Sequence, residues 1–382
     1  MMSTPREIVL AALRHEVPDR IPAYVRKIHD WQRHANVLGV STLPELMDRL
    51  GNSIVSFAPA YLAAEPPVVA EALTPGMPPI WGVAGDVEPY SYSDALPRPL
   101  AHATCAADVD VFAWPVPDVA AWDFAGMRRA LADDPMHARL SPSWNPVFSQ
   151  LCELFGMEQA MVNLRLNRVV VEAALAHLDE FYTAFYGHML DVCGDQLELF
   201  GLGDDFAANR GLLIRPEEWR RLLLPLYAKW LRMAKVRGLF TLMHCCGRIV
   251  EVLPDLIDNG LDAWQTVQTH LPDQDPARLK AQFGSHLTFV GAVDTTNILG
   301  VGSPEQVRTH VADQIRQLGR NGGYICGPDH TILEEVPTEN VVALYSAVAE
   351  FRREGYTLDQ STTGLRSGQA ADGDLLASRA GV

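Results

Sequence analysis

Five apolar runs in the second half of the chain decide the fold: LELFGLG (197–203), GLFTLMHCC (238–246), LDAWQTV (261–267), LTFVGAV (287–293) and GYIC (323–326). Runs with so few polar residues are typical of parallel strands buried on both faces. A helical pattern follows each run, at 216–235, 250–258, 276–282, 304–318 and 339–353. This alternation predicts either an open doubly wound sheet or a closed barrel.

The remaining sequence favours the barrel. No Gly-x-Gly-x-x-Gly motif follows a strand, which argues against a dinucleotide-binding open sheet. Three earlier strand candidates, Ile21–Val25, Ile54–Phe57 and His137–Leu140, bring the expected strands to eight. We therefore predict an α/β fold of the (β/α)8 TIM-barrel type, because such barrels extend well beyond ~250 residues as one domain.

We expect a single barrel domain over residues 1–356, interrupted by one long insertion between the second and third strands. The insertion, residues 61–123, is rich in proline and contains Trp81, Tyr90, Tyr92, Trp114 and Trp122. A segment of this length and aromatic content predicts a cap over the mouth of the barrel. Residues 357–382 are rich in Gly, Ser, Ala, Gln and Asp and show no helical or strand stripe, which predicts a disordered tail.

Charge and composition exclude several classes of partner. With 31 basic and 47 acidic residues, the net charge of −16 disfavours binding to nucleic acid. No stretch approaches the ~20 uninterrupted apolar residues of a membrane span, and the first residues do not read as a signal peptide. We therefore expect a cytoplasmic protein without a membrane partner, whose six cysteines are reduced thiols or metal ligands.

Three soft donor residues lie at the ends of two predicted strands. His244 and Cys246 are two residues apart on one strand and so face the same way, whereas Cys245 faces the opposite way. Cys326 ends another strand, and all strands of a barrel end at the same rim. One imidazole and two thiolates would suit tetrahedral zinc with a fourth position open. The competing interpretation is structural burial, which is common for Cys and His.

Other polar or aromatic residues follow the expected strand ends and are candidates for the same mouth. Catalytic or substrate-orienting roles are predicted for Asp204, Asp205, Asp294 and His330. The alternatives are solvated acids, a helix N-cap for Asp294 and a loop hydrogen bond for His330. Substrate contacts are predicted for Trp144, Gln268, Arg210 and Tyr324; the alternatives are packing for Trp144 and surface placement for Gln268.

The chain resembles the uroporphyrinogen decarboxylase superfamily from about residue 3 to about residue 355. The resemblance is carried by Pro18-Asp19-Arg20, Gly203-Asp204-Asp205 with Arg210-Gly211, His244-Cys245-Cys246-Gly247, Leu253-Pro254-Asp255-Leu256, Gly291-Ala292-Val293-Asp294, Gly322-Gly323-Tyr324-Ile325-Cys326 and the segment Val336–Val341. It implies the same barrel fold.

Within that superfamily the chain resembles the cobalamin-linked methyltransferases, which hold zinc with a His-x-Cys…Cys set that the decarboxylases lack. The resemblance therefore implies zinc at His244, Cys246 and Cys326. The decarboxylases also carry an arginine-rich segment after the first strand. Here that place reads YVRKIHDW (24–31), and together with the net charge of −16 this argues against a polycarboxylate substrate.

The resemblance implies a zinc-dependent methyltransferase that moves a methyl group between a small substrate and methylcobalamin. The substrate would be a thiol acceptor, or a methyl ether or amine donor. Because the chain has no Asp-x-His-x-x-Gly corrinoid signature, cobalamin is expected on a separate corrinoid protein. Two alternatives stay open: a metal-free decarboxylase-like enzyme, and a non-catalytic barrel that binds a small ligand or a corrinoid protein. The direction of transfer and a homodimeric state are also open.

Overall fold

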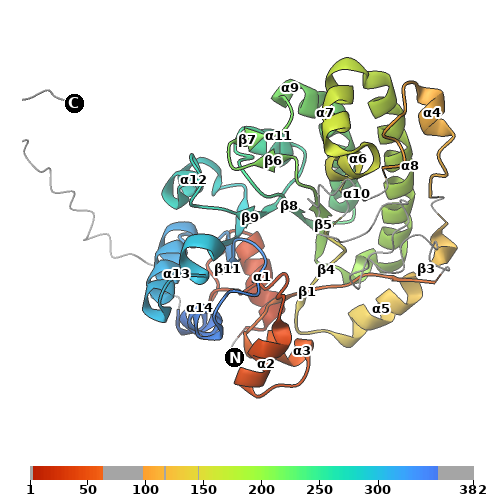
Figure 1. The fold of residues 1–382 in the computed structure, drawn as a ribbon. Coiled ribbons are helices and arrows are strands. Elements are labelled where there is room, and N and C mark those ends of the chain that lie inside the picture. The colour runs from red at the N-terminus through yellow and green to blue at the C-terminus, as the bar shows by residue number, and fades with distance from the viewer. Residues whose placement is uncertain (1–2, 63–97, 116–117, 145, 352–382) are drawn as a thin grey trace, which may run out of the picture.

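A computed structural model describes residues 3–62, 98–115, 118–144 and 146–351, in which seven parallel strands form one curled sheet (Figure 1). The strands, in their order across the sheet, are β1 (Ile54–Ser56), β4 (Ala138–Leu140), β5 (Leu199–Gly203), β8 (Phe240–His244), β9 (Ala263–Val267), β10 (Thr288–Val293) and β11 (Tyr324–Pro328). Each strand overlaps one of the predicted runs.

The predicted first strand closes this sheet through single bridges instead of a continuous ladder. Ala23 forms parallel bridges with Asn52, just before β1, and with Cys326 of β11. The Tyr24 N–H donates to the Cys326 carbonyl at 2.8 Å, and the Ser53 N–H donates to the Ala23 carbonyl at 2.8 Å. The prediction of a TIM barrel is confirmed, with a first strand that is shorter than expected.

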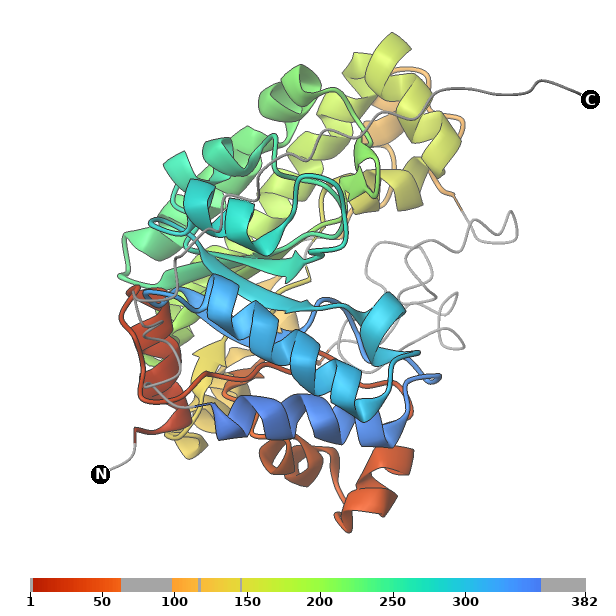
Figure 2. The same ribbon diagram turned by 90° about the vertical axis from the view of Figure 1, so that its left-hand side faces the viewer.

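Helices cover the outside of the sheet (Figure 1). Their bounds are α1 (Pro5–Leu13), α2 (Trp31–Leu38), α3 (Leu43–Arg49), α4 (Ala106–Asp110), α5 (Phe124–Asp133), α6 (Phe148–Phe155), α7 (Met157–Leu166), α8 (Arg168–Cys193), α9 (Pro216–Leu222), α10 (Leu224–Lys235), α11 (Leu253–Asp258), α12 (Pro276–Phe283), α13 (Pro304–Leu318) and α14 (Thr338–Glu350). Short 3-10 segments lie at η1 (Val119–Ala121) and η2 (Gly194–Gln196), and η3 (Thr295–Leu299) is a π-helical turn. Figure 2 shows α13 and α14 side by side on one flank.

The single helix expected over 216–235 is two helices. Pro225 stands in the first turn of α10. Proline has no N–H to donate, and its ring collides with the carbonyl one turn earlier, so a helix cannot run through it undistorted. The chain therefore ends α9 at Leu222 and begins again at Leu224.

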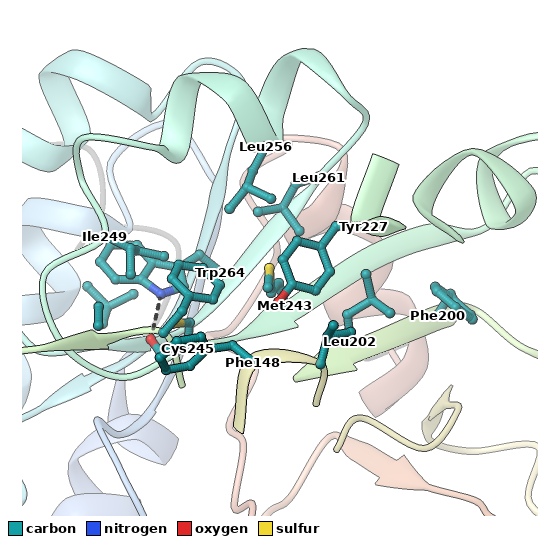
Figure 3. Packing of buried hydrophobic residues seen from close by; sticks show 14 of the residues in the cluster. Phe148, Phe200, Leu202, Tyr227, Met243, Cys245, Ile249, Leu256, Leu261 and Trp264 are labelled. Carbon is teal, nitrogen blue, oxygen red and sulfur yellow. Dashed lines mark hydrogen bonds between the residues drawn. The ribbon is translucent and has the colours of Figure 1, made fainter. Parts of the chain in front are cut away.

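Two apolar clusters pack on opposite faces of the sheet. The inner one fills the barrel with alternate strand residues, including Leu242, Val290 and Ile325, and includes Val9 and Leu13 of α1. The outer cluster lies between the strands and the helices. Figure 3 shows part of it, including Tyr227, Met243, Cys245 and Trp264. The period-2 alternation of β-strands thus assigns each strand residue either to the barrel interior or to the helical layer.

The insertion is described only in part. Its two ends pair as a small antiparallel ribbon of β2 (Ala60–Tyr61) and β3 (Trp122–Asp123). Trp114 stacks on His177 of α8 with ring centroids 4.6 Å apart. Trp81, Tyr90 and Tyr92 of the insertion, and the tail 357–382, lie outside the described residues, so the cap and the disordered tail stay predictions.

A second antiparallel ribbon, β6 (Ala207–Ala208) with β7 (Gly211–Leu212), follows β5. Within the described part of the chain, no helix is both long and apolar enough to span a bilayer.

Candidate metal centre

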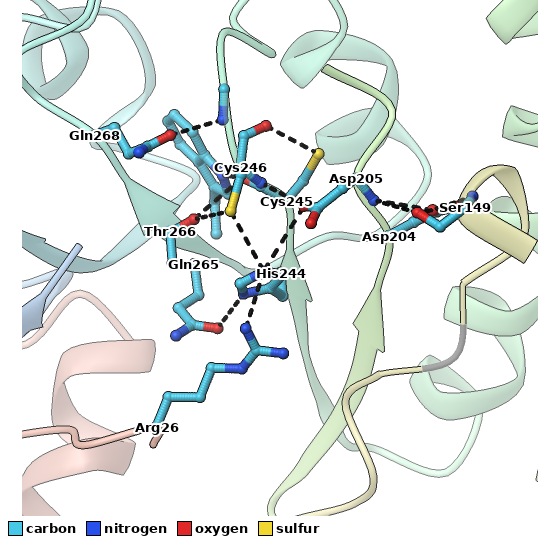
Figure 4. Close-up of polar contacts among 12 residues, drawn as sticks. Arg26, Ser149, Asp204, Asp205, His244, Cys245, Cys246, Gln265, Thr266 and Gln268 are labelled. Carbon is cyan, nitrogen blue, oxygen red and sulfur yellow. Dashed lines mark hydrogen bonds and ion pairs between the residues drawn. The ribbon is translucent and has the colours of Figure 1, made fainter. Parts of the chain in front are cut away.

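Three donor side chains meet at the carboxyl-terminal rim of the barrel. His244 is the last residue of β8 and shares the interior face of Leu242, and Cys246 follows two residues later. The Cys246 Sγ lies 3.6 Å from the His244 Nε2 (Figure 4). His330, just after β11, completes the group: one ligand atom from each of the three residues lies within 4.8 Å of the others. We call these residues the donor set.

The prediction that Cys326 is the third ligand is wrong. Ile325 occupies the barrel interior, so the alternation of β11 turns Cys326 into the outer apolar layer. There it is fully buried near Tyr345 of α14, and burial raises the pKa of its thiol to about 12. His330, predicted as a substrate-orienting residue, stands where the third donor was expected.

The surroundings of the buried His244 imidazole leave its Nε2 atom available as a metal ligand. Its Nδ1 lies 2.9 Å from the amide oxygen of Gln265, which can only accept, so Nδ1 carries the hydrogen and Nε2 keeps a lone pair. Burial, reinforced by the nearby Arg26 charge, lowers the pKa of His244 to about 3, so the ring is neutral at physiological pH. A neutral imidazole is the form that binds metals.

The spacing of the donor atoms fits zinc. With Zn–S and Zn–N bonds of about 2.3 and 2.1 Å, a tetrahedral site separates sulfur from nitrogen by about 3.6 Å. The observed distance from Cys246 Sγ to His244 Nε2 is 3.6 Å. One sulfur and two imidazole nitrogens form a three-ligand set typical of a zinc site that keeps a fourth position open. The residues present therefore fit zinc.

The loop that carries Cys246 is held by hydrogen bonds. The Cys246 N–H donates to Asp205 Oδ1 at 2.9 Å, and the Thr266 hydroxyl donates to the Cys246 sulfur at 3.4 Å. The Gly247 N–H donates to the Gln268 side-chain oxygen at 2.8 Å. Burial, and then the Asp205 charge, raise the pKa of Cys246, so a bound cation is what would favour its thiolate.

Gly247 is required by the same turn. Its φ of +81° lies in the left-handed region, and an added Cβ would stand 2.7 Å from the Ala208 backbone nitrogen.

Arg26 is a residue of this site that the sequence analysis missed. Its guanidinium NH1 lies 3.0 Å from His244 Nε2, and its Cζ lies 5.6 Å from the centre of the Trp144 ring. Because Nε2 has a single lone pair, Arg26 and a metal ion compete for it. Metal binding would release the guanidinium beside the donor set. The only sequence signal was an arginine just beyond the first strand.

The two aspartates after β5 have different surroundings. Asp204 accepts hydrogen bonds from the N–H groups of Val147, Phe148 and Ser149 at the start of α6, and from the Tyr227 hydroxyl. This acid therefore anchors a helix and faces away from the donor set (Figure 4). Asp205 is buried beside the donor set, with its Oδ1 3.8 Å from His244 Nε2.

Among the predicted substrate contacts, Trp144 lies next to the donor set, with its ring centroid 5.7 Å from that of His244. Gln268 supports the turn after Cys246. Arg210 is exposed on the β6–β7 turn, where its carbonyl accepts from Arg248. The prediction for Tyr324 is wrong, because its side chain lies on the outward face of β11 and its hydroxyl donates to the Gly291 carbonyl.

Asp294 is the N-cap of η3, in agreement with the alternative interpretation of the sequence. Its Oδ1 accepts from the N–H groups of Thr296 and Asn297 at 2.9 and 2.8 Å, which fixes the start of η3. Its second oxygen faces His270.

The stability of the zinc-free protein is expected to fall as the pH drops below 6.5. The unfolded chain protonates His244 near its ordinary pKa of 6.5, whereas the folded protein holds that pKa at about 3, so unfolding takes up a proton between these values. The contribution of His244 to the free energy of unfolding is complete above pH 6.5 and falls on acidification. The expected loss is about 1 kcal/mol between pH 7 and 5.5. Urea unfolding of wild type and His244→Gln in the presence of EDTA measures the difference. An identical pH dependence in both proteins would contradict this account.

Comparison with known proteins places the chain in a family. A family model described as uroporphyrinogen decarboxylase (URO-D) matches residues 147–351, just over half of the chain. A curated relative, the methylated-thiol–coenzyme M methyltransferase of Methanosarcina mazei, is 28% identical over 190 residues, which cover 49% of this chain and 47% of that protein. The chain therefore spans about half the length of this curated relative in the match.

Among solved structures, a methyltransferase from Methanosarcina mazei superposes with a TM-score of 0.60. It shares 20% sequence identity, and the superposition covers 91% of this chain and 99% of that one. This likeness concerns the fold and covers nearly the whole chain. The chain belongs to the uroporphyrinogen decarboxylase family.

Proposed function

We propose that this protein is a zinc-dependent methyltransferase that moves a methyl group between a small substrate and a cobalamin carried by a partner protein. The observation that carries the proposal is the donor set of His244, Cys246 and His330 at the open rim of the barrel, with a sulfur–nitrogen spacing suited to zinc. The curated relative acts on methylated thiols and coenzyme M, which supports a thiol or thioether substrate.

Zinc held by the donor set would lower the pKa of a coordinated thiol, so that the substrate is a thiolate at neutral pH. The surrounding residues have separate tasks. Gln265 keeps the His244 lone pair directed at the site, and Asp205 holds the Cys246 loop through its backbone N–H. Trp144 supplies an apolar wall beside His244, which would exclude water from the sulfur.

Arg26 would bind the anionic end of the substrate. When a metal ion binds the His244 lone pair, the Arg26 guanidinium no longer bonds to His244. It remains beside the donor set and over the Trp144 ring. A charge-assisted hydrogen bond to a carboxylate or sulfonate contributes about 1.5–3 kcal/mol, which corresponds to about 10- to 100-fold in affinity. Substrates with a thiol and an acidic group a few bonds apart fit this arrangement.

Replacement of Arg26 by methionine is expected to raise KM for 3-mercaptopropionate by about 10-fold or more, because the charge-assisted contact is lost. KM for uncharged ethanethiol should change little, and zinc content should be retained. Steady-state kinetics with both thiols test this difference between the two KM values. Arg26→Lys, which keeps the charge, is the matched control. An equal loss with both thiols would contradict an anion-binding role.

The activity itself is tested by incubating zinc-loaded protein with methylcobalamin and a panel of thiols, and by following the cobalamin absorbance. In this direction the Co–C bond breaks, an S–C bond forms and the cobalamin is left as cob(I)alamin. Thiol-dependent demethylation is the expected result. Methyl thioethers and methyl ethers with cob(I)alamin test the reverse direction. No transfer in either direction with zinc-loaded wild type would overturn the proposal.

A further inference from the structure

A second cluster of metal-binding side chains lies at the same rim, and the mechanism above makes no use of it. His270 follows β9, Asp294 follows β10 and Asp329 follows β11. The His270 Nδ1 lies 3.5 Å from Asp294 Oδ2 and 3.5 Å from Asp329 Oδ2. One ligand atom of each residue lies within 4.8 Å of the other two. We call these three residues the rim triad.

Both carboxylates of the rim triad are buried and held in place by hydrogen bonds. Asp294 Oδ1 accepts two backbone N–H groups, and its Oδ2 accepts from the Asn297 side chain. Asp329 is fully buried, and its Oδ1 accepts from the N–H and the hydroxyl of Thr295. Asp329 Oδ2 is buried and has no hydrogen-bond partner among the described residues. This oxygen lies 3.5 Å from His270 Nδ1, in the group whose ligand atoms, Asp294 included, lie within 4.8 Å of one another.

His270 alone does not balance these two acids. Its separation of 3.5 Å from each oxygen is longer than the ~2.7–2.9 Å of a charge-assisted hydrogen bond. A protonated imidazole also carries one positive charge against two carboxylates. Nearby His310 contributes no cation, because its Nε2 accepts from the Asp294 N–H and burial lowers its pKa. Within the described ranges, no lysine or arginine forms an ion pair with either acid.

The geometry suits a cation at the centre of the rim triad. Metal–nitrogen and metal–oxygen bonds of about 2.0–2.2 Å separate the ligand atoms by about 3.0 Å at neighbouring octahedral positions and by about 3.4 Å in a tetrahedral arrangement. The observed separations from His270 Nδ1 are both 3.5 Å. Two buried carboxylates that share one imidazole as their source of positive charge are costly, and a divalent cation would neutralise both.

We propose that His270, Asp294 and Asp329 form a second cation site that binds a divalent ion such as Mn²⁺, separate from the donor set. Carboxylate oxygens with one imidazole favour a harder ion than the sulfur of Cys246 does. The site would join the loops after β9, β10 and β11. Asp329 directly precedes His330, so an ion here would also fix the loop that presents the third zinc donor.

Mn²⁺ titrated into protein that carries one equivalent of zinc, and followed by its EPR signal, tests the proposal. Mn²⁺ competes poorly with zinc at a thiolate site, so bound Mn²⁺ reports the rim triad. Wild type should bind one equivalent. Asp329→Asn keeps the Oδ1 acceptor for Thr295 but replaces Oδ2 with a donor, and it should weaken binding at least 10-fold. His270→Gln should do the same.

Asp273→Asn is the matched control, because it removes an exposed carboxylate from the same β9–α12 loop, and it should bind Mn²⁺ like wild type. His270 is on the surface, so His270→Gln decides the question if Asp329→Asn fails to fold. Zinc content is measured in parallel in every variant and reports the donor set independently of Mn²⁺ binding, which keeps this result separate from the proposed zinc activity. Absence of Mn²⁺ binding by wild type, or wild-type binding by both triad variants, would overturn the second site.

Discussion

Replacement of Cys246 or His330 by alanine is expected to remove stoichiometric zinc from the protein and to reduce methyl transfer by about 10³-fold or more. Loss of a catalytic metal forfeits several kcal/mol of transition-state stabilisation, and about 4 kcal/mol corresponds to a 10³-fold change in rate. Both side chains place a donor atom in the set around His244 Nε2. Metal analysis after gel filtration, together with the methylcobalamin assay, measures both effects.

Cys326→Ala is the matched control for Cys246→Ala, since the two substitutions make the same chemical change. Cys326 faces the outer apolar layer near Tyr345, so its loss should cost some packing and leave the zinc content near wild type. Zinc loss from Cys326→Ala with full retention by His330→Ala would refute the donor set and restore the ligand assignment made from the sequence.

Replacement of Asp204 by alanine is expected to destabilise the folded protein by about 4 kcal/mol or more. The carboxylate receives three backbone N–H groups at the start of α6, at 2.8, 2.6 and 2.9 Å, as well as the hydroxyls of Ser149 and Tyr227. Alanine would leave these buried donors without an acceptor, and each unsatisfied buried group costs about 1–3 kcal/mol. Urea unfolding followed by circular dichroism gives the change.

The control for this substitution is Asp195→Ala, which removes an exposed carboxylate paired with Arg128. Exposed ion pairs contribute little, so the effect should be small. If Asp204→Ala and Asp195→Ala shift the urea midpoint equally, Asp204 is not the anchor of α6. Loss of activity from Asp204→Ala without loss of stability would instead support the catalytic role that the sequence suggested.

Local sequence patterns were sufficient to predict the barrel and two of the three residues of the donor set. The strands were predictable because parallel strands buried on both faces require apolar runs, and these runs are visible in one chain segment at a time. His244 and Cys246 were predictable for the same reason: both lie in one segment, where a spacing of two residues fixes a shared direction. The division of 216–235 into α9 and α10 was also visible in principle, at Pro225.

The third donor was not predictable in this way. The short run GYIC has apolar residues at neighbouring positions, so its pattern does not say which of them faces the interior. Packing decides it: Ile325 joins Leu242 and Val290 inside the barrel, which turns Cys326 outward and leaves the following loop to present His330. Arg26 was missed because it approaches His244 from 218 residues away in the chain, across the closure of the barrel.

The order of strands and helices and the shared direction of His244 and Cys246 were therefore readable from the sequence, because each follows from the period of a single segment. The barrel followed from the number of these strands and from the absence of a dinucleotide-binding motif. Three features depend on packing: which face of β11 is internal, the approach of Arg26 to the donor set, and the meeting of Asp294 and Asp329 beside His270. These features depend on how separate strands pack around one axis, and no local period encodes that arrangement.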